Sequence, residues 1–181
     1  GDDYKKLAEQ VNKFGELCKA GGLKLAYHNH DFEFTKFGDT NGYEILLNET
    51  DKNLVDFEMD IYWVRAANED PIAWLKKYPN RFKLCHVKDL TNTANNGHDS
   101  CVLGTGTIDF KKVLKAGAKY GLETFIVEQE AFTGTSPIDA AGLDAAEARR
   151  RQMEEDAKGL DFSYDGDGHI VSDGTEAPTE E

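Results

Sequence analysis

The 181-residue chain lacks several features that mark whole classes of protein. No apolar run approaches the ~20 residues of a membrane-spanning helix, so the sequence predicts no membrane partner. It has 21 basic residues against 34 acidic ones and a net charge of −13. Because phosphate binding needs a basic surface, a nucleic-acid partner is not expected. Cys18, Cys85 and Cys101 are an odd set without paired spacing, which argues against a disulfide framework.

Two sequence motifs are also incomplete. Gly104-Thr-Gly106 lacks the third glycine of a dinucleotide fingerprint and follows a polar loop, so it predicts a turn before a helix. Residues 165–168 resemble the middle of a calcium loop, but the loop's two end positions have no acid, and a hairpin turn is the better prediction. The sequence shows no secretory leader, yet Gly1 is not a natural start, so localisation stays open between cytoplasm and bacterial periplasm.

The charge is unevenly distributed. Residues 132–181 have thirteen acids against four bases and therefore hold −9 of the net −13. A chain of this length normally forms one domain, and its 39% apolar content suffices for a core. We therefore expect a catalytic body over residues 1–137 and an acidic tail over 138–181, partly helical or hairpin and disordered at its end.

Apolar and turn patterns predict alternating helices and strands. The predicted helices span Tyr4–Ala20, Tyr43–Asn48, a segment capped by Asp70-Pro71, and Phe110–Tyr120. The predicted strands span Leu23–Asn29, Leu54–Asp60, Arg81–Val87 and Glu123–Gln129. The polar loop Thr91–Ser100 is long enough to be a lid over a site. Beyond residue 134 we expect a charged helix over Asp144–Lys158 and a hairpin of Phe162–Tyr164 with His169–Val171.

Each predicted strand ends near a residue that can bind a divalent metal: His28, Asp60, His86 and Glu128. Parallel α/β folds collect their sites at the carboxyl ends of the strands, so these side chains should converge. Two imidazoles with two carboxylates suit an ion of intermediate hardness. The pattern therefore predicts an enzyme with one divalent metal, Mn, Co, Zn or Mg.

Five segments resemble the sugar phosphate isomerase/epimerase group, the xylose isomerase-like TIM barrels. They are Tyr27-His-Asn-His-Asp-Phe-Glu-Phe34, Phe57-Glu-Met-Asp-Ile-Tyr-Trp63, His86-Val-Lys-Asp89, Gly104-Thr-Gly-Thr-Ile-Asp109 and Val127-Glu-Gln-Glu130. The resemblance runs from about Tyr4 to Pro137 and implies an α/β fold of the (β/α)8 type. It corresponds to strands five to eight, a half barrel, followed by the acidic tail. It also implies that a metal is held at positions matching His28, Asp60, His86 and Glu128.

This chain departs from the pattern at His28, where the family's sugar epimerases have glutamate. Those epimerases use two metal-bound glutamates to move a proton, and the resemblance does not extend that mechanism to this chain. Relatives with the His-Asn-His sequence look closer to enzymes acting on keto sugars or keto-glycosides, including lyases and hydratases. The expected reaction is therefore sugar or sugar phosphate isomerisation or epimerisation by proton abstraction next to a carbonyl, with a lyase or hydratase as the alternative.

Further site roles follow from neighbouring positions. Glu128, Lys88, His30 and Glu33 are the candidate catalytic residues, and Trp63 and Glu130 the candidate substrate-binding residues. Lys88 can stabilise developing negative charge or form a salt bridge to Glu58 or Glu130. Glu33 is weighed equally as an acid/base or a loop carboxylate. Glu58 shares a face with Asp60, and the preferred prediction pairs it with a lysine such as Lys88.

Two other classes compete with a sugar enzyme. Endonuclease IV chemistry needs several zinc ions, more histidines and a basic surface, which five histidines and −13 disfavour. A non-catalytic barrel fragment would expose strand edges and part of its core. We therefore expect a carbohydrate as the small-molecule partner, and either a homo-oligomer or pairing with a missing amino-terminal barrel half.

Overall fold

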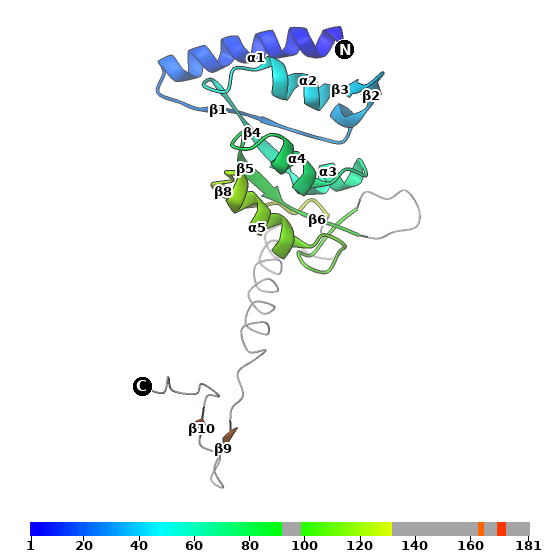
Figure 1. Ribbon diagram of the computed structural model, residues 1–181, viewed down its shortest axis with the longest axis vertical. Coiled ribbons are helices and arrows are strands. Elements are labelled where there is room, and N and C mark those ends of the chain that lie inside the picture. The colour runs from blue at the N-terminus through cyan, green and yellow to red at the C-terminus, as the bar shows by residue number, and fades with distance from the viewer. Residues whose placement is uncertain (92–98, 132–162, 165–169, 173–181) are drawn as a thin grey trace, which may run out of the picture.

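The computed structural model describes residues 1–91, 99–131, 163–164 and 170–172. Its centre is a sheet of four parallel strands in the spatial order β1-β4-β5-β8 (Figure 1). The strands are β1 (Leu25–His28), β4 (Val55–Asp60), β5 (Phe82–Val87) and β8 (Thr124–Val127). Because they run in one direction, their carboxyl ends lie at the same edge of the sheet.

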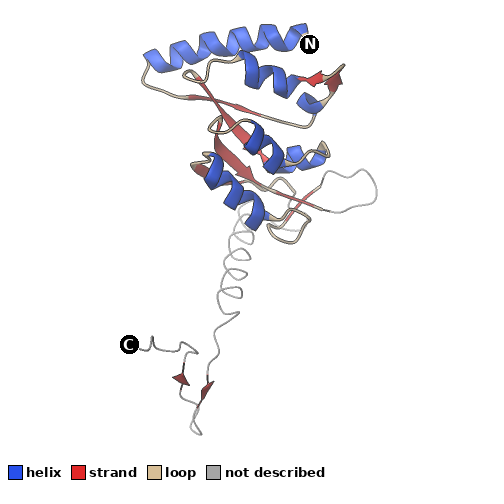
Figure 2. Cartoon of the chain, in the orientation of Figure 1, coloured by secondary structure: helices blue, strands red, loops and turns tan. Residues whose placement is uncertain are grey.

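A helix precedes each of these strands (Figure 2). The helices are α1 (Asp2–Ala20), α2 (Gly42–Glu49), α4 (Pro71–Lys77) and α5 (Phe110–Tyr120). Parallel strands need a crossover connection, and the helices provide it. Helix α1 packs beside α2, and α4 packs beside α5. This repeat confirms the predicted order of helices and strands, and the bounds of α5 are those predicted.

The two faces of the sheet differ in chemistry because side chains alternate along a strand. Val55, Phe57 and Met59 of β4 are buried in the core with aromatic side chains of the helices, such as Tyr43 and Trp74. The intervening residues of β4 are acidic and lie on the opposite face. That polar face, at its carboxyl edge, is where the candidate site lies.

The helix ends follow their local sequence. Asn41, Asp70 and Asp109 each accept a hydrogen bond from a backbone N–H in the first turn of the helix that follows, which satisfies a donor that the helix itself leaves free. Gly121 ends α5 with φ +103, a left-handed conformation that favours glycine. These observations confirm the predicted cap at Asp70 and the predicted stop at Gly121.

Several short elements were not predicted. Helix α3 (Ile61–Ala66) follows β4 directly, and the 3-10 helix η1 (Phe32–Phe34) follows β1. Two small antiparallel ladders join β2 (Lys36–Phe37) to β3 (Thr40–Asn41) and β6 (Asp89–Leu90) to β7 (Ser100–Cys101). Elements of two or three residues are too short for a hydrophobic period to develop, so the pattern could not predict η1 or the two small ladders.

The predicted lid, Thr91–Ser100, lies mostly outside the described residues, although β6 and β7 pair at its two ends. Strands β9 (Ser163–Tyr164) and β10 (Ile170–Ser172) are antiparallel, as the predicted hairpin requires, whereas its turn lies outside the described residues. The predicted helix over Asp144–Lys158 and the predicted disordered end also lie outside them. Among the described helices, none is both long enough and apolar enough to cross a membrane.

Candidate metal centre

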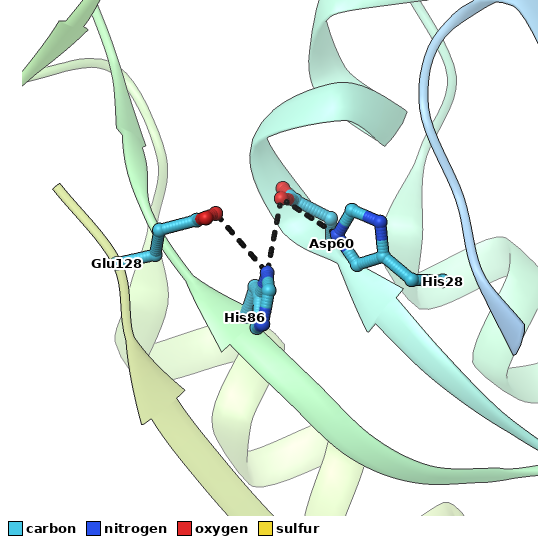
Figure 3. Close-up of side chains that lie close together, drawn as sticks. All are labelled: His28, Asp60, His86 and Glu128. Carbon is cyan, nitrogen blue, oxygen red and sulfur yellow. Dashed lines mark hydrogen bonds and ion pairs between the residues drawn. The ribbon is translucent and has the colours of Figure 1, made fainter. Parts of the chain in front are cut away.

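Four potential metal ligands meet at the carboxyl edge of the sheet (Figure 3). His28 ends β1, Asp60 ends β4, His86 lies in β5 and Glu128 follows β8. One ligand atom from each residue lies within 4.8 Å of the others. The register explains the cluster, because Asp60 is paired directly with His86 across β4 and β5. The structure thus brings together the four residues that the sequence proposed as ligands.

Asp60 and His86 form the middle of the cluster. Oδ2 of Asp60 lies 3.3 Å from Nε2 of His28 and 3.6 Å from Nδ1 of His86. Nδ1 of His86 also lies 3.1 Å from Oε2 of Glu128. Burial raises the pKa of Asp60, but the two imidazoles and the Trp63 N–H outweigh it and hold that pKa below its ordinary value. Asp60 is therefore a carboxylate at neutral pH, ready to bind a cation.

The donor set fits a divalent ion. Nδ1 of His86 is buried and has no hydrogen-bond partner within the part of the chain that the structure describes. A buried polar atom without a partner is costly, and a cation between it and the neighbouring carboxylates would satisfy it. Two carboxylates balance the charge of a divalent ion, and two imidazoles supply nitrogen lone pairs. The role of these four residues as ligands remains a prediction.

Lys88 lies beside this cluster and is fully buried. Its ammonium group forms an ion pair with Glu130, one of its two predicted partners, and lies 3.7 Å from Oε2 of Glu128. It also lies over the rings of Tyr62 and Trp63, 4.3 and 5.1 Å from their centres. Carboxylates and aromatic faces together offset the cost of burying this charge.

The preferred prediction that Glu58 pairs with Lys88 is wrong. Oε1 of Glu58 lies 3.3 Å from Nε2 of His86 instead. The register gives the reason: Glu58 is paired with Leu84 of β5, and Lys88 follows four residues later, just after the strand ends. At about 3.3 Å per residue this separation is roughly 13 Å along the strand, beyond the reach of the two side chains.

Aromatic rings surround His30. Its ring stacks on Phe32 with centres 5.4 Å apart, and it lies 5.4 Å from the ring of Trp63 and 5.0 Å from that of His28. Trp63 lies in the first turn of α3, which begins directly after Asp60. The predicted catalytic His30 and the predicted substrate-binding Trp63 thus lie together next to a candidate metal ligand.

Glu33 is fully buried in η1. Its carboxylate accepts hydrogen bonds from the Tyr27 hydroxyl at 2.8 Å and from the His30 backbone N–H at 2.9 Å. Tyr27 alternates with His28 along β1, so its side chain and Glu33 lie on the helix side of the sheet. Of the two roles weighed for Glu33, this placement supports the loop carboxylate rather than an acid/base at the metal centre.

The family of xylose isomerase-like TIM barrels matches residues 1–159 of the sequence. The chain belongs to the xylose isomerase-like TIM barrel family. Its parallel α/β fold is that of the family, and the match includes all four strands of the central sheet and all four candidate ligands.

Similar proteins include enzymes that act on sugars and related compounds. The chain is 40% identical over 89 residues to an inosose dehydratase of Clostridium perfringens, covering 49% of this chain and 29% of that protein. It is 32% identical over 171 residues to an inosose dehydratase of Clostridium tetani, covering 86% and 55% respectively. A solved sugar phosphate isomerase/epimerase of Parabacteroides distasonis is 32% identical with a TM-score of 0.68, covering 80% of this chain and 51% of that one. The chain thus spans about half the length, or less, of the relatives it matches.

In this member of the xylose isomerase-like family, Asn29 holds two strand ends together. Its fully buried side-chain oxygen accepts hydrogen bonds from the Asp60 backbone N–H and the Tyr43 hydroxyl, both at 3.0 Å. Asn29 therefore fixes the backbone of one candidate ligand beside another, His28. This role was not predicted, although an amide between two histidines at a strand end is a signal for it.

Asp89 was also missed. It is buried, and its carboxylate accepts hydrogen bonds from the backbone N–H groups of Leu90, Gly104, Gly106 and Ile108 at 2.8–3.3 Å. Gly104 has φ +82, and an added Cβ at Gly106 would lie 2.4 Å from the Asp89 carboxylate. The turn predicted at Gly104-Thr-Gly106 is confirmed. Asp89 thus holds this turn against the chain segment that follows β5, next to Lys88.

Proposed function

We propose that this chain supplies the metal centre of an enzyme that removes a proton next to the carbonyl of a sugar-like substrate. We further propose dehydration of a keto polyol of the inosose type as its reaction. The cluster of His28, Asp60, His86 and Glu128, with the buried ammonium of Lys88 beside it, is the observation that carries this proposal. The similarity to inosose dehydratases supports the reaction class.

The four clustered residues would hold the divalent ion, which when bound polarises a carbonyl group. Glu128 is the base that takes the proton from the neighbouring carbon. Lys88, 3.7 Å from Glu128, stabilises the negative charge that then develops on the carbonyl oxygen. Its burial strengthens this effect, since the charge is poorly screened there.

Loss of water completes the proposed reaction. The carbon beyond the deprotonated one loses its hydroxyl group, and a double bond forms between these two carbons. His30 donates a proton to the departing hydroxyl, which leaves as water. Trp63 offers an indole face to the carbon-bound hydrogens of the substrate, and Glu130 accepts hydrogen bonds from its hydroxyl groups. Both lie beside Lys88, so substrate placement and charge stabilisation share one wall of the site.

His28 favours dehydration over epimerisation. A two-glutamate mechanism needs a carboxylate on each side of the substrate carbon, whereas β1 contributes an imidazole to the cluster. One carboxylate base, Glu128, can remove the proton, and elimination does not require a second one to return it to the opposite face.

The test uses the chain stripped of metal by a chelator and reloaded with Mn, Co, Zn or Mg in turn. Inosose is added, and the absorbance of a conjugated enone is followed while bound metal is measured in the same sample. Turnover should need the metal and should fall at least about 100-fold in Glu128→Gln, the contribution expected of a general base. Glu123→Gln, which alters an ion pair with Lys83 at the other end of the sheet, is the control and should keep wild-type turnover. Turnover that survives metal removal, or that is equal in both variants, would contradict the proposal.

A second candidate is a sugar isomerase or epimerase, favoured by the 32% identity and TM-score of 0.68 to the Parabacteroides distasonis protein. The two candidates differ in what leaves the substrate. In heavy water, an epimerase incorporates deuterium at the carbon next to the carbonyl without enone absorbance, whereas a dehydratase produces the enone.

A further inference from the structure

Glu58 is a carboxylate on the polar face of the sheet that the proposed reaction does not use. It stands two residues before Asp60 in β4, so the two side chains share a face. It is largely buried, with 17% of its side chain exposed. Within the described part of the chain its ion-pair partner is His86, rather than a lysine or an arginine. A carboxylate in this position needs a donor, and the His86 ring is the group in reach.

The two ring nitrogens of His86 face different groups. Nε2 lies 3.3 Å from Oε1 of Glu58. Nδ1 faces the cluster, 3.1 Å from Glu128 and 3.6 Å from Asp60, and has no hydrogen-bond partner in the region that the structure describes. A neutral imidazole has one N–H donor and one acceptor nitrogen. If the hydrogen is on Nε2, facing Glu58, the lone pair of Nδ1 points among the other ligands.

We infer that Glu58 is a positioning residue, which keeps the hydrogen of His86 on Nε2 and turns Nδ1 toward a bound ion. The inference rests on the metal centre proposed above. Histidine ligands commonly donate their second ring N–H to a carboxylate, and loss of that partner lowers metal affinity about 10- to 100-fold. Glu58 acts through His86 and need not contact substrate.

The position on the sheet supports this role over that of a fifth ligand. Glu58 is in register with His28 on one side and Leu84 on the other, whereas Asp60 is in register with His86. Glu58 therefore lies two residues further from the carboxyl edge of the sheet than Asp60. It faces Nε2 of His86, whereas the cluster faces Nδ1. The four atoms that lie within 4.8 Å of one another come from the other residues.

The test compares Glu58→Gln with Glu123→Gln in the full chain. Glu123 is a matched control because its carboxylate also lies against a nitrogen of a basic side chain, Nζ of Lys83 at 2.7 Å, away from the cluster. Zinc affinity is measured by competition with a chromophoric chelator, and the melting temperature is measured without metal. Nitrogen NMR of the zinc-loaded chain reports which ring nitrogen of His86 bears hydrogen. Glu58→Gln should lower zinc affinity about 10- to 100-fold and shift the His86 nitrogen signals. Glu123→Gln should change neither.

Each other outcome decides against the inference. Unchanged zinc affinity in Glu58→Gln, with zinc lost in His86→Ala, overturns it and leaves the metal centre standing. Zinc affinity retained in His86→Ala overturns the metal centre, and the inference with it. A loss as large as that in His86→Ala makes Glu58 a direct ligand. A loss with a lower melting temperature and unmoved His86 signals makes Glu58 a structural residue only.

Discussion

His86 is the residue with the most direct influence on the candidate centre, because its ring lies within 3.6 Å of three carboxylates. We predict that His86→Ala lowers metal affinity by at least about 10- to 100-fold, since removing a ligand should cost no less than removing its partner. The fold should persist, as measured by circular dichroism beside elemental analysis. His30→Ala is the control, because its ring packs against Phe32 and Trp63, and it should keep its metal. Equal metal content in the two variants would refute the assignment.

The pH dependence of the same histidine has a definite sign. Asp60 raises the pKa of His86, burial opposes this, and Glu128 and Glu58 raise it further. A proton on His86 competes with a metal ion, so metal affinity should increase as pH rises through this raised pKa.

In the metal-free chain the charged ring stabilises the folded state. That contribution is complete below the unfolded pKa, ~6.5, and is lost as pH rises through the folded value. Above about pH 6.5 the stability of the metal-free chain should therefore fall while its metal affinity rises. Calorimetry and metal titration at matched pH values measure both, and a metal affinity independent of pH would be incompatible with His86 as a ligand.

At the scale of elements, the turn before α5 depends on close approach of two backbone segments. We predict that Gly106→Ala destabilises the chain by about 1–3 kcal/mol, because its Cβ would lie 2.4 Å from the Asp89 carboxylate. Gly21→Ala is the control, since Gly21 has φ −86 and its Cβ would meet nothing closer than 3.5 Å. The midpoints of denaturant unfolding measure the stability of both variants. Equal midpoints would contradict the prediction, since the turn would then accommodate the added methyl group without cost.

The sequence was informative where one strong local signal decided the structure. Periodicity and the glycine at position 121 predicted α5, and the apolar runs placed all four candidate ligands at or near strand ends. Helix α3 was not predicted because its Tyr62-Trp63-Val64 run has residues that favour strands. The Asp60 side chain caps the helix and overrides that preference. The contacts of Glu58, Asn29 and Asp89 could not be predicted. Each depends on strand register or on a loop that folds back, and a local sequence pattern specifies neither.

For the whole molecule, the sheet has two outer strands among the described residues, β1 and β8. Phe125, Ile126 and Val127 of β8 are 44%, 39% and 49% exposed. An exposed apolar edge strand without proline or lysine invites pairing with another strand. We therefore predict that the chain pairs in solution with a second copy or with further barrel strands. Light scattering of the purified chain measures this, and a stable monomer of 20.2 kDa that melts cooperatively would contradict it.

The two oxygens of Asp60 serve different neighbours. Oδ1 accepts a hydrogen bond from the Trp63 backbone N–H at 3.1 Å, and Oδ2 faces His28 and His86. A change of charge at Oδ2 therefore reaches the first turn of α3, which carries one of the chain's two tryptophans. The other, Trp74, stacks on Tyr78 in a different helix. The protein thus contains its own optical reporter: emission from Trp63 should track occupancy of the centre over a constant background from Trp74.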